Sequence, residues 1–592
     1  MTNGVEIRQT PWTRTHGLLF AAILLAYVLI VWQALQAPLF VLDDGIELAY
    51  VRSHPTLAAL WQRDCFLYFR PAKNLCFLAF NAIQPFGLAA CRLLAIAIGL
   101  GSAVAVLAMF RRLLRAPAAC LAATACWLLA PTMVSVTVWL SCVNILLMTG
   151  MAAVSILLYL EGRERAGASG TVYLVGSWLT SLLAMLCYEG AVCLPGLVVL
   201  IDFFLFPERL RSKRSWRVYA GLLSALVLYL LLRAMRGAVA QQILCGNFGD
   251  AANWQIVVAA PWFFFQHLWS WLWPFERQAV IGGYCWREVS PLLLGCAWLG
   301  ALALAAGCWL LRRLFAMGAL GVAWCLVAFL PMSNLLAFRN GPYGDYYLAL
   351  SGMGLALAFG WAIGQLAAHG PRVRGALLAL VALSLWRLAA VGEGLAWSYA
   401  WNDPGELLQR TLRTFPQAFS AMNEYGRLLY CEGAIDACQA WADRASAIAP
   451  HNRDSYVLRV LVAERHGNIE LARQQLDHYM QCGGETESWG WYFKGYILDE
   501  HLGDTNGAIR CYQQAIANRT GWWSPEVLDS MGALAFFAAQ RGDRHEAIDL
   551  WEQVLRVEPG RNRVRQNLVR AYHELGDEAR AKQHWILLQK NH

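Results

Sequence analysis

Long apolar runs alternate with short polar segments through the first two thirds of the chain. An α-helix needs about 20 mostly apolar residues to cross the hydrocarbon core of a bilayer. Runs of this kind predict about eleven transmembrane helices, near residues 17–38, 90–110, 117–136, 141–160, 172–188, 190–206, 216–234, 291–311, 314–333, 346–367 and 374–395. The expected fold is all-α and begins with a polytopic helix bundle.

Clusters of Arg and Lys follow every second apolar run. Such clusters mark the cytoplasmic side of a membrane protein. Eleven spans put all the clusters on that side, together with residues 1–16. Loop 39–89, residues 235–290, loop 334–345 and everything after residue 396 then lie outside. That side is the periplasm if the protein is in a bacterial inner membrane, and the lumen if it is in the endoplasmic reticulum.

One further apolar segment, residues 254–274, is rich in Trp and contains Pro261, Gln266 and His267. If it were a full span, Arg312 and Arg313 would face outside, against the charge rule. Trp is enriched at membrane–water interfaces. The segment is therefore interpreted as re-entrant or interfacial.

After residue 420 the sequence repeats itself. Turn glycines recur at spacings of 34, 36, 39 and 34 residues, and each is followed five residues later by a small residue. This period with small residues at fixed positions is typical of tetratricopeptide repeats. The glycines are Gly433, Gly467, Gly503, Gly542 and Gly576, and the small residues are Cys438, Ala472, Ala508, Ala547 and Ala581. The stacked repeats could bind a protein in their groove, or serve as a spacer or dimerisation platform.

Composition supports this division. Hydrophobic residues make up 58% of the chain. Residues 1–402 hold 27 Lys and Arg against 15 Asp and Glu, whereas residues 403–592 hold 21 against 25. These values exclude a single soluble core, a disordered chain and a fibrous protein. The predicted layout is a cytoplasmic N-terminus (1–16), a membrane domain (17–396), a connector (397–419) and a repeat domain (420–592).

Several functions are disfavoured by what the sequence contains. The net charge of +8 comes from loops between apolar runs, so it does not indicate nucleic-acid binding. The 17 cysteines form no CxxC or Cys/His spacing, which argues against structural zinc. No phosphate-binding Walker motif occurs, which disfavours an ATP-driven transporter. Cys245 and Cys285 flank one predicted outside region and could form a disulfide.

The first outside loop begins with two adjacent carboxylates, Asp43 and Asp44, directly after a predicted span. Carboxylates at a membrane boundary suit general-base chemistry on an acceptor hydroxyl, because one can take the proton while the other orients the acceptor or shifts its neighbour's pKa. They could instead hold a divalent cation. They could also be solvated acids at a helix start.

Three other outside segments carry candidate chemistry. Arg70 and Lys73 could bind phosphate, or Arg70 could extend from the bilayer to the interface. Glu189 lies between two apolar runs and is either functional or an exposed acid in a turn. The late loop holds Arg339, Tyr343, Asp345 and Tyr346, which could contact a lipid-linked phosphate and a sugar or form an aromatic belt.

Several stretches, in order, resemble the GT-C glycosyltransferases with lumenal tetratricopeptide repeats, namely the transmembrane-and-tetratricopeptide O-mannosyltransferases and their bacterial relatives. The family's first-loop Asp-Asp resembles Asp43-Asp44, and its Tyr-Arg-Pro-Leu stretch resembles residues 68–72. The family's His-Pro stretch with a following Trp resembles Ala130-Pro131 with Trp139. Its Lys-Glu turn with a following Leu-Pro resembles Tyr188-Glu189 with Leu194-Pro195. Its late loop resembles residues 331–335 together with 344–351.

The sequence departs from that family at two positions. Asp345 stands where the family has Arg, and the His before Pro131 is missing. The sugar and the acceptor are therefore not implied by the resemblance. The resemblance does imply an enzyme that takes a sugar from a polyprenyl-phosphate carrier, with the first-loop Asp as base and inversion at the anomeric carbon.

The prediction is an inverting glycosyltransferase that moves a sugar from a polyprenyl-phosphate donor to a protein hydroxyl (O-glycosylation) at the outer face of the membrane. The repeats would bind the acceptor or a partner. The same chemistry on a polysaccharide or lipid, and a non-enzymatic scaffold for envelope assembly, are the alternatives. A Mg²⁺ or Mn²⁺ cofactor stays open, and no metal ligands are assigned. The assigned residues are Asp43 and Asp44 (catalytic), Arg70, Lys73 and Arg339 (donor phosphate), and Glu189, Tyr343, Asp345 and Tyr346 (substrate).

Overall fold

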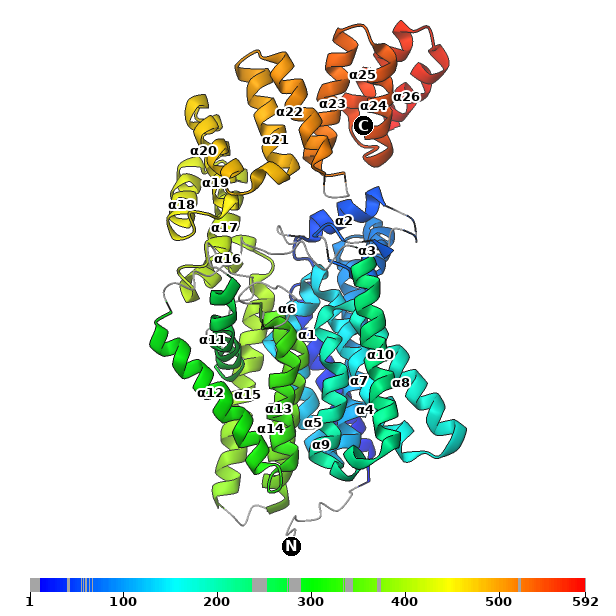
Figure 1. The fold of residues 1–592 in the computed structure, drawn as a ribbon, viewed down its shortest axis with the longest axis vertical. Helices are drawn as coiled ribbons and strands as arrows, with labels where there is room; N and C mark the ends of the chain where they lie inside the picture. The colour runs from blue at the N-terminus through cyan, green and yellow to red at the C-terminus, as the bar shows by residue number, and fades with distance from the viewer. Residues whose placement is uncertain are drawn as a thin grey trace. The chain divides into compact units, whose positions relative to one another are not determined.

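The computed structural model describes residues 11–590, apart from residues 40–42, 55, 57, 59, 60, 63, 67, 237–252, 274, 276–288, 334, 336–343, 370–373 and 520–522. Every regular element in the described part of the chain is a helix (Figure 1). The predicted all-α class is confirmed. The chain packs as two units, one comprising most residues up to Tyr425 and the other comprising Gly426–His592 with parts of the segment between residues 46 and 67.

The first unit contains eight described helices that are long and apolar enough to cross a membrane. They are α1 (Arg14–Trp32), α4 (Leu88–Leu114), α7 (Val143–Glu164), α8 (Gly167–Cys187), α10 (Lys213–Met235), α12 (Pro291–Leu311), α14 (Leu348–His369) and α15 (Arg374–Ala400). All eight coincide with predicted spans, and the protein is a multi-pass membrane protein.

The other three predicted spans differ from a simple straight helix. Residues 117–136 form α5 (Pro117–Leu128) and α6 (Pro131–Val138), which meet at a bend of 52°. The bend is explained by Pro131, which cannot continue the hydrogen-bond ladder of α5. Residues 190–206 become a 3₁₀ turn, η4 (Glu189–Cys193), followed by α9 (Leu194–Leu205), and residues 314–333 become the short α13 (Ala316–Phe329).

Shorter elements lie between the spans. The first loop holds α2 (Asp44–Ser53) and α3 (Pro71–Ile83). The Trp-rich segment forms α11 (Asn253–Leu272), with Pro261 inside it, and α11 is not among the eight helices suited to crossing. The predicted connector contains the end of α15 and all of α16 (Pro404–Thr414).

Small residues let the core helices of this unit approach closely. Gly321 of α13 and Gly354 of α14 face each other, and a Cβ atom on either would clash with the carbonyl oxygen of the other. Gly360 of α14 likewise lies against the backbone of Ala119 in α5. Backbone approach of this kind replaces hydrophobic burial as the packing force between helices in lipid.

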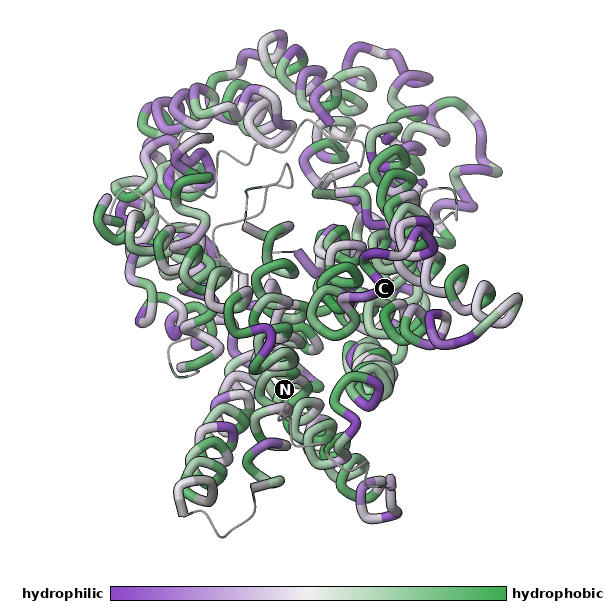
Figure 2. Tube along the Cα trace, turned by 60° about the horizontal axis from the view of Figure 1, so that its bottom comes forward, coloured by the Kyte–Doolittle hydropathy of each residue, from purple (hydrophilic) through white to green (hydrophobic). Residues whose placement is uncertain are grey.

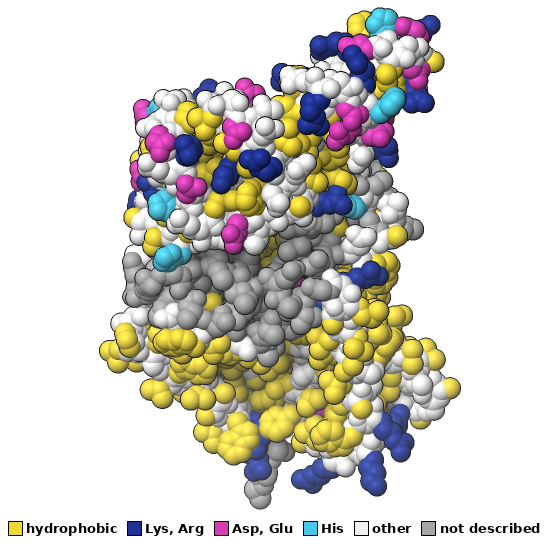
Figure 3. Space-filling model, turned by 45° about the horizontal axis from the view of Figure 1, so that its top comes forward, with side chains coloured by type: hydrophobic (Ala, Val, Ile, Leu, Met, Phe, Trp, Pro, Cys, Tyr) yellow, Lys and Arg dark blue, Asp and Glu magenta, His cyan; other side chains and the backbone are white. Residues whose placement is uncertain are grey.

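The outer surface of the unit is apolar, as lipid contact requires. Leu18, Leu292, Leu299 and Leu310 are 65–76% exposed. Figure 2 shows hydrophobic residues along these helices. Figure 3 shows apolar side chains over much of the visible face of the unit, with Lys and Arg side chains at one end.

The second unit confirms the predicted repeats. Helices α17 to α26 form successive helix–turn–helix pairs. The five turn glycines have positive φ, from +67° to +88°, and the small residues that follow them are almost completely buried. The helices are α17 (Phe419–Cys431), α18 (Ile435–Ile448), α19 (Arg453–Arg465), α20 (Ile469–Gln481), α21 (Ser488–Tyr496), α22 (Thr505–Ala517), α23 (Pro525–Gln540), α24 (Arg544–Val557), α25 (Asn562–Glu574) and α26 (Glu578–Lys590).

Candidate active site

Asp43 is held by the indole of Trp139, which directly follows α6. Its Oδ1 accepts a hydrogen bond of 2.6 Å from Nε1 of Trp139. Trp139 is the residue that ends α6, and it is buried. Asp43 as a residue is partly exposed. A carboxylate that is positioned yet accessible can take a proton from an incoming group.

Asp44 is completely buried and begins α2. Its Oδ1 accepts hydrogen bonds of 2.8 Å from both the backbone N–H and the hydroxyl of Ser141. Ser141 lies in the short 3₁₀ turn that follows Trp139. The two adjacent carboxylates thus accept hydrogen bonds from Trp139 and Ser141, which are two residues apart in the chain. Asp44 is not a solvated cap, since its side chain is removed from water.

Arg92 donates hydrogen bonds to the backbone of both the segment before Asp43 and the segment before Trp139. This buried arginine near the start of α4 donates to the carbonyl oxygens of Leu35, Pro38 and Val138 at 3.3, 2.8 and 3.5 Å. The first two carbonyls lead toward Asp43, and the third precedes Trp139. The sequence analysis did not single out Arg92. A charged residue inside a predicted span was the available signal.

Arg70 and Glu189 form a buried, bidentate ion pair. Nε and Nη2 of Arg70 donate to the two carboxylate oxygens of Glu189 at 2.9 and 2.5 Å. The guanidinium also lies over the rings of Tyr68 and Tyr188, at 3.8 and 4.5 Å from their centroids. Arg70 therefore does not extend to the interface, and Glu189 is not an exposed turn residue.

The pair stays ionised because each partner stabilises the charge of the other. Burial on its own would raise the pKa of Glu189, but the charge and hydrogen bonds of Arg70 bring that pKa below its ordinary value. Burial likewise opposes the charge of Arg70, and Glu189 raises the pKa of Arg70 well above its ordinary value. Arg233, near the end of α10, adds a second positive charge that acts on Glu189.

Lys73 is buried at the first turn of α3, and its Nζ lies 3.9 Å from Oδ2 of Asp64. Asp64 also accepts a hydrogen bond of 2.8 Å from the backbone N–H of Tyr68. Lys73 is therefore engaged by a carboxylate, as Arg70 is. Two of the predicted phosphate-binding cations, Arg70 and Lys73, are therefore already paired with carboxylates.

The late loop supplies two of its four candidates to the same place. Asp345 is buried, and Oγ1 of Thr132 donates to it at 3.2 Å. The ring of Tyr346 meets those of Trp139 and Tyr188 edge to face, at centroid distances of 5.8 and 6.4 Å. Tyr346 thus joins the Asp43 side of the site to the Arg70 side. Arg339 and Tyr343 lie outside the described residues, as do Cys245 and Cys285.

Direct contacts join the two halves of the arrangement. Asp43 and Asp44 are bonded to Trp139 and Ser141, which lie two residues apart. The guanidinium of Arg70 lies over the ring of Tyr188, and the ring of Tyr346 contacts the rings of both Trp139 and Tyr188. Residues predicted from separate stretches of the sequence therefore lie around one aromatic cluster.

The donor set near Asp43 does not define a metal site. Among the described residues, no group of three or more His, Cys, Asp or Glu side chains could hold a metal ion. Asp43 and Asp44 each already accept hydrogen bonds from protein donors. Two carboxylates engaged in this way fall short of the oxygen-rich shells that Mg²⁺ and Mn²⁺ prefer.

No family model matches the chain. No curated protein sequence matches it either. Solved structures that resemble it include ArnT from Cupriavidus metallidurans bound to undecaprenyl phosphate, which is 17% identical, covers 76% of this chain and 79% of its own, and has a TM-score of 0.37. The archaeal oligosaccharyltransferase AglB from Archaeoglobus fulgidus, in complex with an inhibitory peptide and a dolichol-phosphate, is 13% identical, covers 66% and 56%, and has a TM-score of 0.37.

The repeats have structural neighbours of their own. YrrB, a TPR protein with an unusual peptide-binding site, is 15% identical, covers 32% of this chain and 93% of its own, and has a TM-score of 0.25. These likenesses are too weak to transfer a function.

Proposed function

We propose that this protein is a membrane glycosyltransferase that moves a sugar from a polyprenyl-phosphate donor to a hydroxyl group of a protein acceptor. The observation that carries the proposal is the contact of Tyr346 with two rings, that of Trp139, which is bonded to Asp43, and that of Tyr188, which lies under the guanidinium of Arg70. An accessible carboxylate suits removal of the acceptor's proton, and buried cations suit stabilisation of the negative charge on a phosphate leaving group. The resemblance to GT-C enzymes adds to this proposal.

Asp43 is the base in the proposed reaction. It takes the proton of the acceptor hydroxyl while that oxygen forms a bond to the anomeric carbon of the sugar. The bond between the anomeric carbon and the phosphate oxygen breaks at the same time, and its electron pair leaves with the polyprenyl phosphate. Attack from the face opposite the leaving group inverts the anomeric centre. The hydrogen bond from Trp139 holds Asp43 in place for this step.

Asp44 and Glu189 act by positioning in this proposal. Asp44 ties the start of α2 to Ser141 and so fixes the backbone that carries Asp43. Glu189 orients the guanidinium of Arg70 by accepting hydrogen bonds from two nitrogens of that guanidinium. Arg70 and Lys73 are paired with Glu189 and Asp64, so Arg233 supplies the surplus positive charge beside the leaving phosphate in this proposal. Tyr346, between Trp139 and Tyr188, provides an aromatic surface for the sugar.

The direction of the site follows from the charge pattern. Placing the basic clusters in the cytoplasm puts Asp43, Arg70, Glu189 and the repeat domain on the outer side of the membrane. A lipid-linked donor can reach such a site from the bilayer. The repeats, whose architecture suits peptide and protein binding, would then present the acceptor.

The test compares intact masses of envelope proteins from cells that carry the native chain, Asp43→Asn or Glu208→Gln. Glu208 is an exposed acid of the same unit and serves as the matched control. We expect a sugar-sized mass to disappear from specific proteins in the Asp43 variant only. The lost mass would identify the sugar class. A mass change confined to lipids or polysaccharides would select the alternative acceptors.

The scaffold alternative makes the opposite prediction. Under it, Asp43→Asn has no effect, and a chain truncated after Tyr425 loses function. Membrane insertion of each variant is checked by protease protection, so that a misfolded chain is not mistaken for an inactive one. Unchanged glycoprotein, lipid and polysaccharide masses with inserted Asp43→Asn and Asp44→Asn would end the enzyme proposal.

A further inference from the structure

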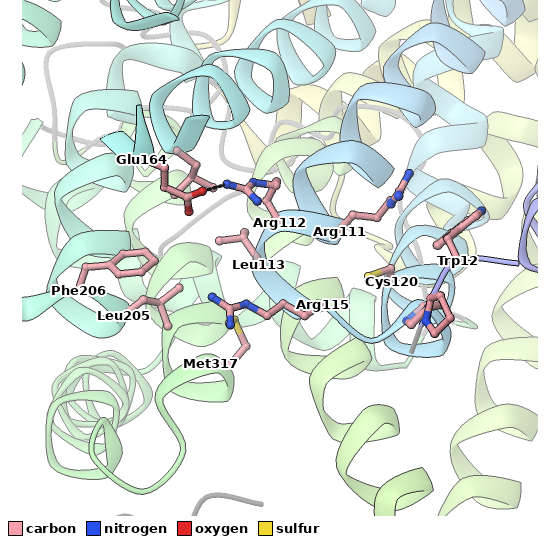
Figure 4. Close-up of a pocket in the computed structure, with 13 residues that line it drawn as sticks. Trp12, Arg111, Arg112, Leu113, Arg115, Cys120, Glu164, Leu205, Phe206 and Met317 are labelled. Atoms are coloured by element: carbon pink, nitrogen blue, oxygen red, sulfur yellow. Dashed lines mark hydrogen bonds and ion pairs between the residues drawn. The ribbon is translucent and has the colours of Figure 1, made fainter. Parts of the chain in front are cut away.

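A pocket of about 760 Å³ lies where α4 ends and α5 begins. Figure 4 shows the side chains around it. Three arginines and one acid combine with apolar walls, and the lining residues are Pro11, Trp12, Arg111, Arg112, Leu113, Arg115, Pro117, Cys120, Leu160, Glu164, Leu205, Phe206 and Met317.

This pocket is separate from the candidate active site. Arg92, which binds the backbone next to Asp43, is near the first turn of α4, and Arg115 follows the last residue of the same helix. At 1.5 Å per residue the two arginines are about 35 Å apart. The pocket therefore lies at the opposite end of the bundle, which is the end that the charge pattern assigns to the cytoplasm.

The three arginines are engaged differently. Arg112 is bound to Glu161 and Glu164. The guanidinium of Arg111 stacks over the ring of Trp12, at 4.6 Å from the ring centroid. Arg115 forms no ion pair with any described residue. Arg111 and Arg115 thus have no carboxylate partner among the described residues.

Arg115 also has an unfavourable backbone conformation. Its φ is +62°, and it is the one non-glycine residue with positive φ in the described part of the chain. A Cβ atom makes this region costly, so glycine is the usual residue there. Figure 4 shows the Arg115 side chain extending toward Leu205 and Met317 rather than away from the pocket. An arginine retained where glycine fits best suggests that its side chain is needed.

The chemistry of the surroundings defines what would bind. A guanidinium presents a fork of donors that matches phosphate oxygens. The start of α5, with Ala116 as its N-cap, adds the partial positive charge of a helix N-terminus. Leu113, Leu160, Leu205, Phe206 and Met317 provide an apolar wall beside these donors. Basic pockets between membrane helices on the cytoplasmic side bind anionic lipid headgroups.

We propose that this pocket binds the phosphate headgroup of an anionic membrane lipid, with Arg115 as the main ligand and the apolar wall along the lipid chains. The apolar wall at the end of membrane helices favours a lipid phosphate over free phosphate. The proposal is independent of glycosyl transfer, because the pocket and the candidate active site share no residue. Cationic residues that only set membrane orientation would need neither a pocket nor a strained backbone.

The test uses the purified full chain in detergent micelles and native mass spectrometry. Dioleoyl phosphatidic acid is the probe, and dioleoyl phosphatidylcholine, with the same chains and no net charge, is the reference lipid. The variants are Arg115→Gln and Arg115→Gly. The matched control is Arg214→Gln/Arg217→Gln, which removes exposed arginines of α10 that do not line the pocket.

We expect the native chain and the control to retain phosphatidic acid in preference to phosphatidylcholine. Arg115→Gln should weaken the retention about tenfold, as expected for the loss of a charged hydrogen-bond partner. Arg115→Gly should weaken it equally while the melting temperature stays the same or rises, because glycine relieves the backbone strain.

Three results would overturn the proposal. One is equal retention by the native chain and both Arg115 variants. Another is an equal loss in the control, which would mean that any surface arginine suffices. A third is displacement of phosphatidic acid by inorganic phosphate at equal concentration, which would assign the site to a free anion.

Discussion

The indole nitrogen of Trp139 donates a 2.6 Å hydrogen bond to Oδ1 of Asp43, across 96 residues of sequence. The hydrogen bond joins the end of the bent α5–α6 pair to the first residue of the acidic pair. It leaves Asp43 partly exposed, while the neighbouring Asp44 is removed from water and tied to Ser141. Two adjacent carboxylates thus have different environments, which suits one for chemistry and the other for support.

Replacing Trp139 by Phe keeps most of the ring and removes the N–H donor. We expect the transfer rate to fall about 10- to 100-fold, since hydrogen bonds to charged groups contribute about 1.5–3 kcal/mol. The measurement is single-turnover transfer with the purified chain. Trp298→Phe removes an indole hydrogen bond to the backbone of Val258 and is the control. An equal loss in both variants would contradict a specific role for Trp139.

Arg92→Met should reduce transfer without preventing membrane insertion. Three carbonyls around Asp43 and Trp139 lose their donor, so both segments are held less firmly. Arg387→Met, which removes an arginine bonded to the carbonyl of Cys126, is the control. The readouts are the transfer rate and protease sensitivity of the first loop. Full activity in Arg92→Met would show that Asp43 is positioned without it.

Glu189→Gln should destabilise the first unit by about 3–5 kcal/mol, because it leaves the charge of Arg70 buried without a partner. The double change Arg70→Met/Glu189→Leu should recover much of that loss, since it removes both charges. Thermal unfolding of the full chain in detergent measures both. A double variant no more stable than the single one would contradict the charge argument.

The same pair predicts a pH dependence. The pKa of Glu189 is lower in the folded chain than its ordinary value of 4.5, so ionised Glu189 stabilises the fold. This contribution is fully present above pH 4.5 and is lost as the pH falls through the lower, folded value. The difference in melting temperature between the native chain and Glu189→Gln should stay constant from about pH 5 to 8 and narrow below about pH 4.5. A difference that narrows near neutrality would contradict this assignment.

The repeat turns offer a test of backbone conformation. Gly542 has a φ of +88°, so Gly542→Ala should destabilise the α23–α24 pair by about 1–2 kcal/mol. Gly532, within α23, has open space around its Cβ position, and Gly532→Ala should stabilise the helix by about 0.5–1 kcal/mol. Amide hydrogen exchange of α23 and α24 in the full chain measures both changes. Shifts of the same sign would contradict the turn argument.

Local signals predicted the repeats accurately. Each turn glycine and the small residue after it belong to one pair of helices that are adjacent in sequence. Their regular spacing along the chain is therefore enough to identify the repeats. The three atypical spans were less predictable, because Pro131 and the 3₁₀ turn at Glu189 interrupt runs whose apolar content is continuous.

The candidate site was predicted in its charged residues but not in its connections. Asp43, Arg70 and Glu189 stand out as charges beside apolar runs. Their partners Trp139, Ser141 and Arg233 come from other spans, and no local pattern pairs residues across such separations. The sequence suggested Arg70 as a phosphate ligand and Glu189 as a substrate contact. In the structure the two side chains bind each other.

The contact between Gly321 and Gly354 carries a consequence for sequence variation. Each glycine occupies space that a single methyl group on the other would need, so neither position can be changed and then compensated at its partner. Larger residues can enter only if α13 and α14 separate along their length. That separation would shift Met332 and Asp345, which stand at the ends of these two helices nearest the site. Divergence of this protein should therefore proceed around a fixed pair of glycines, even while the sugar or acceptor changes.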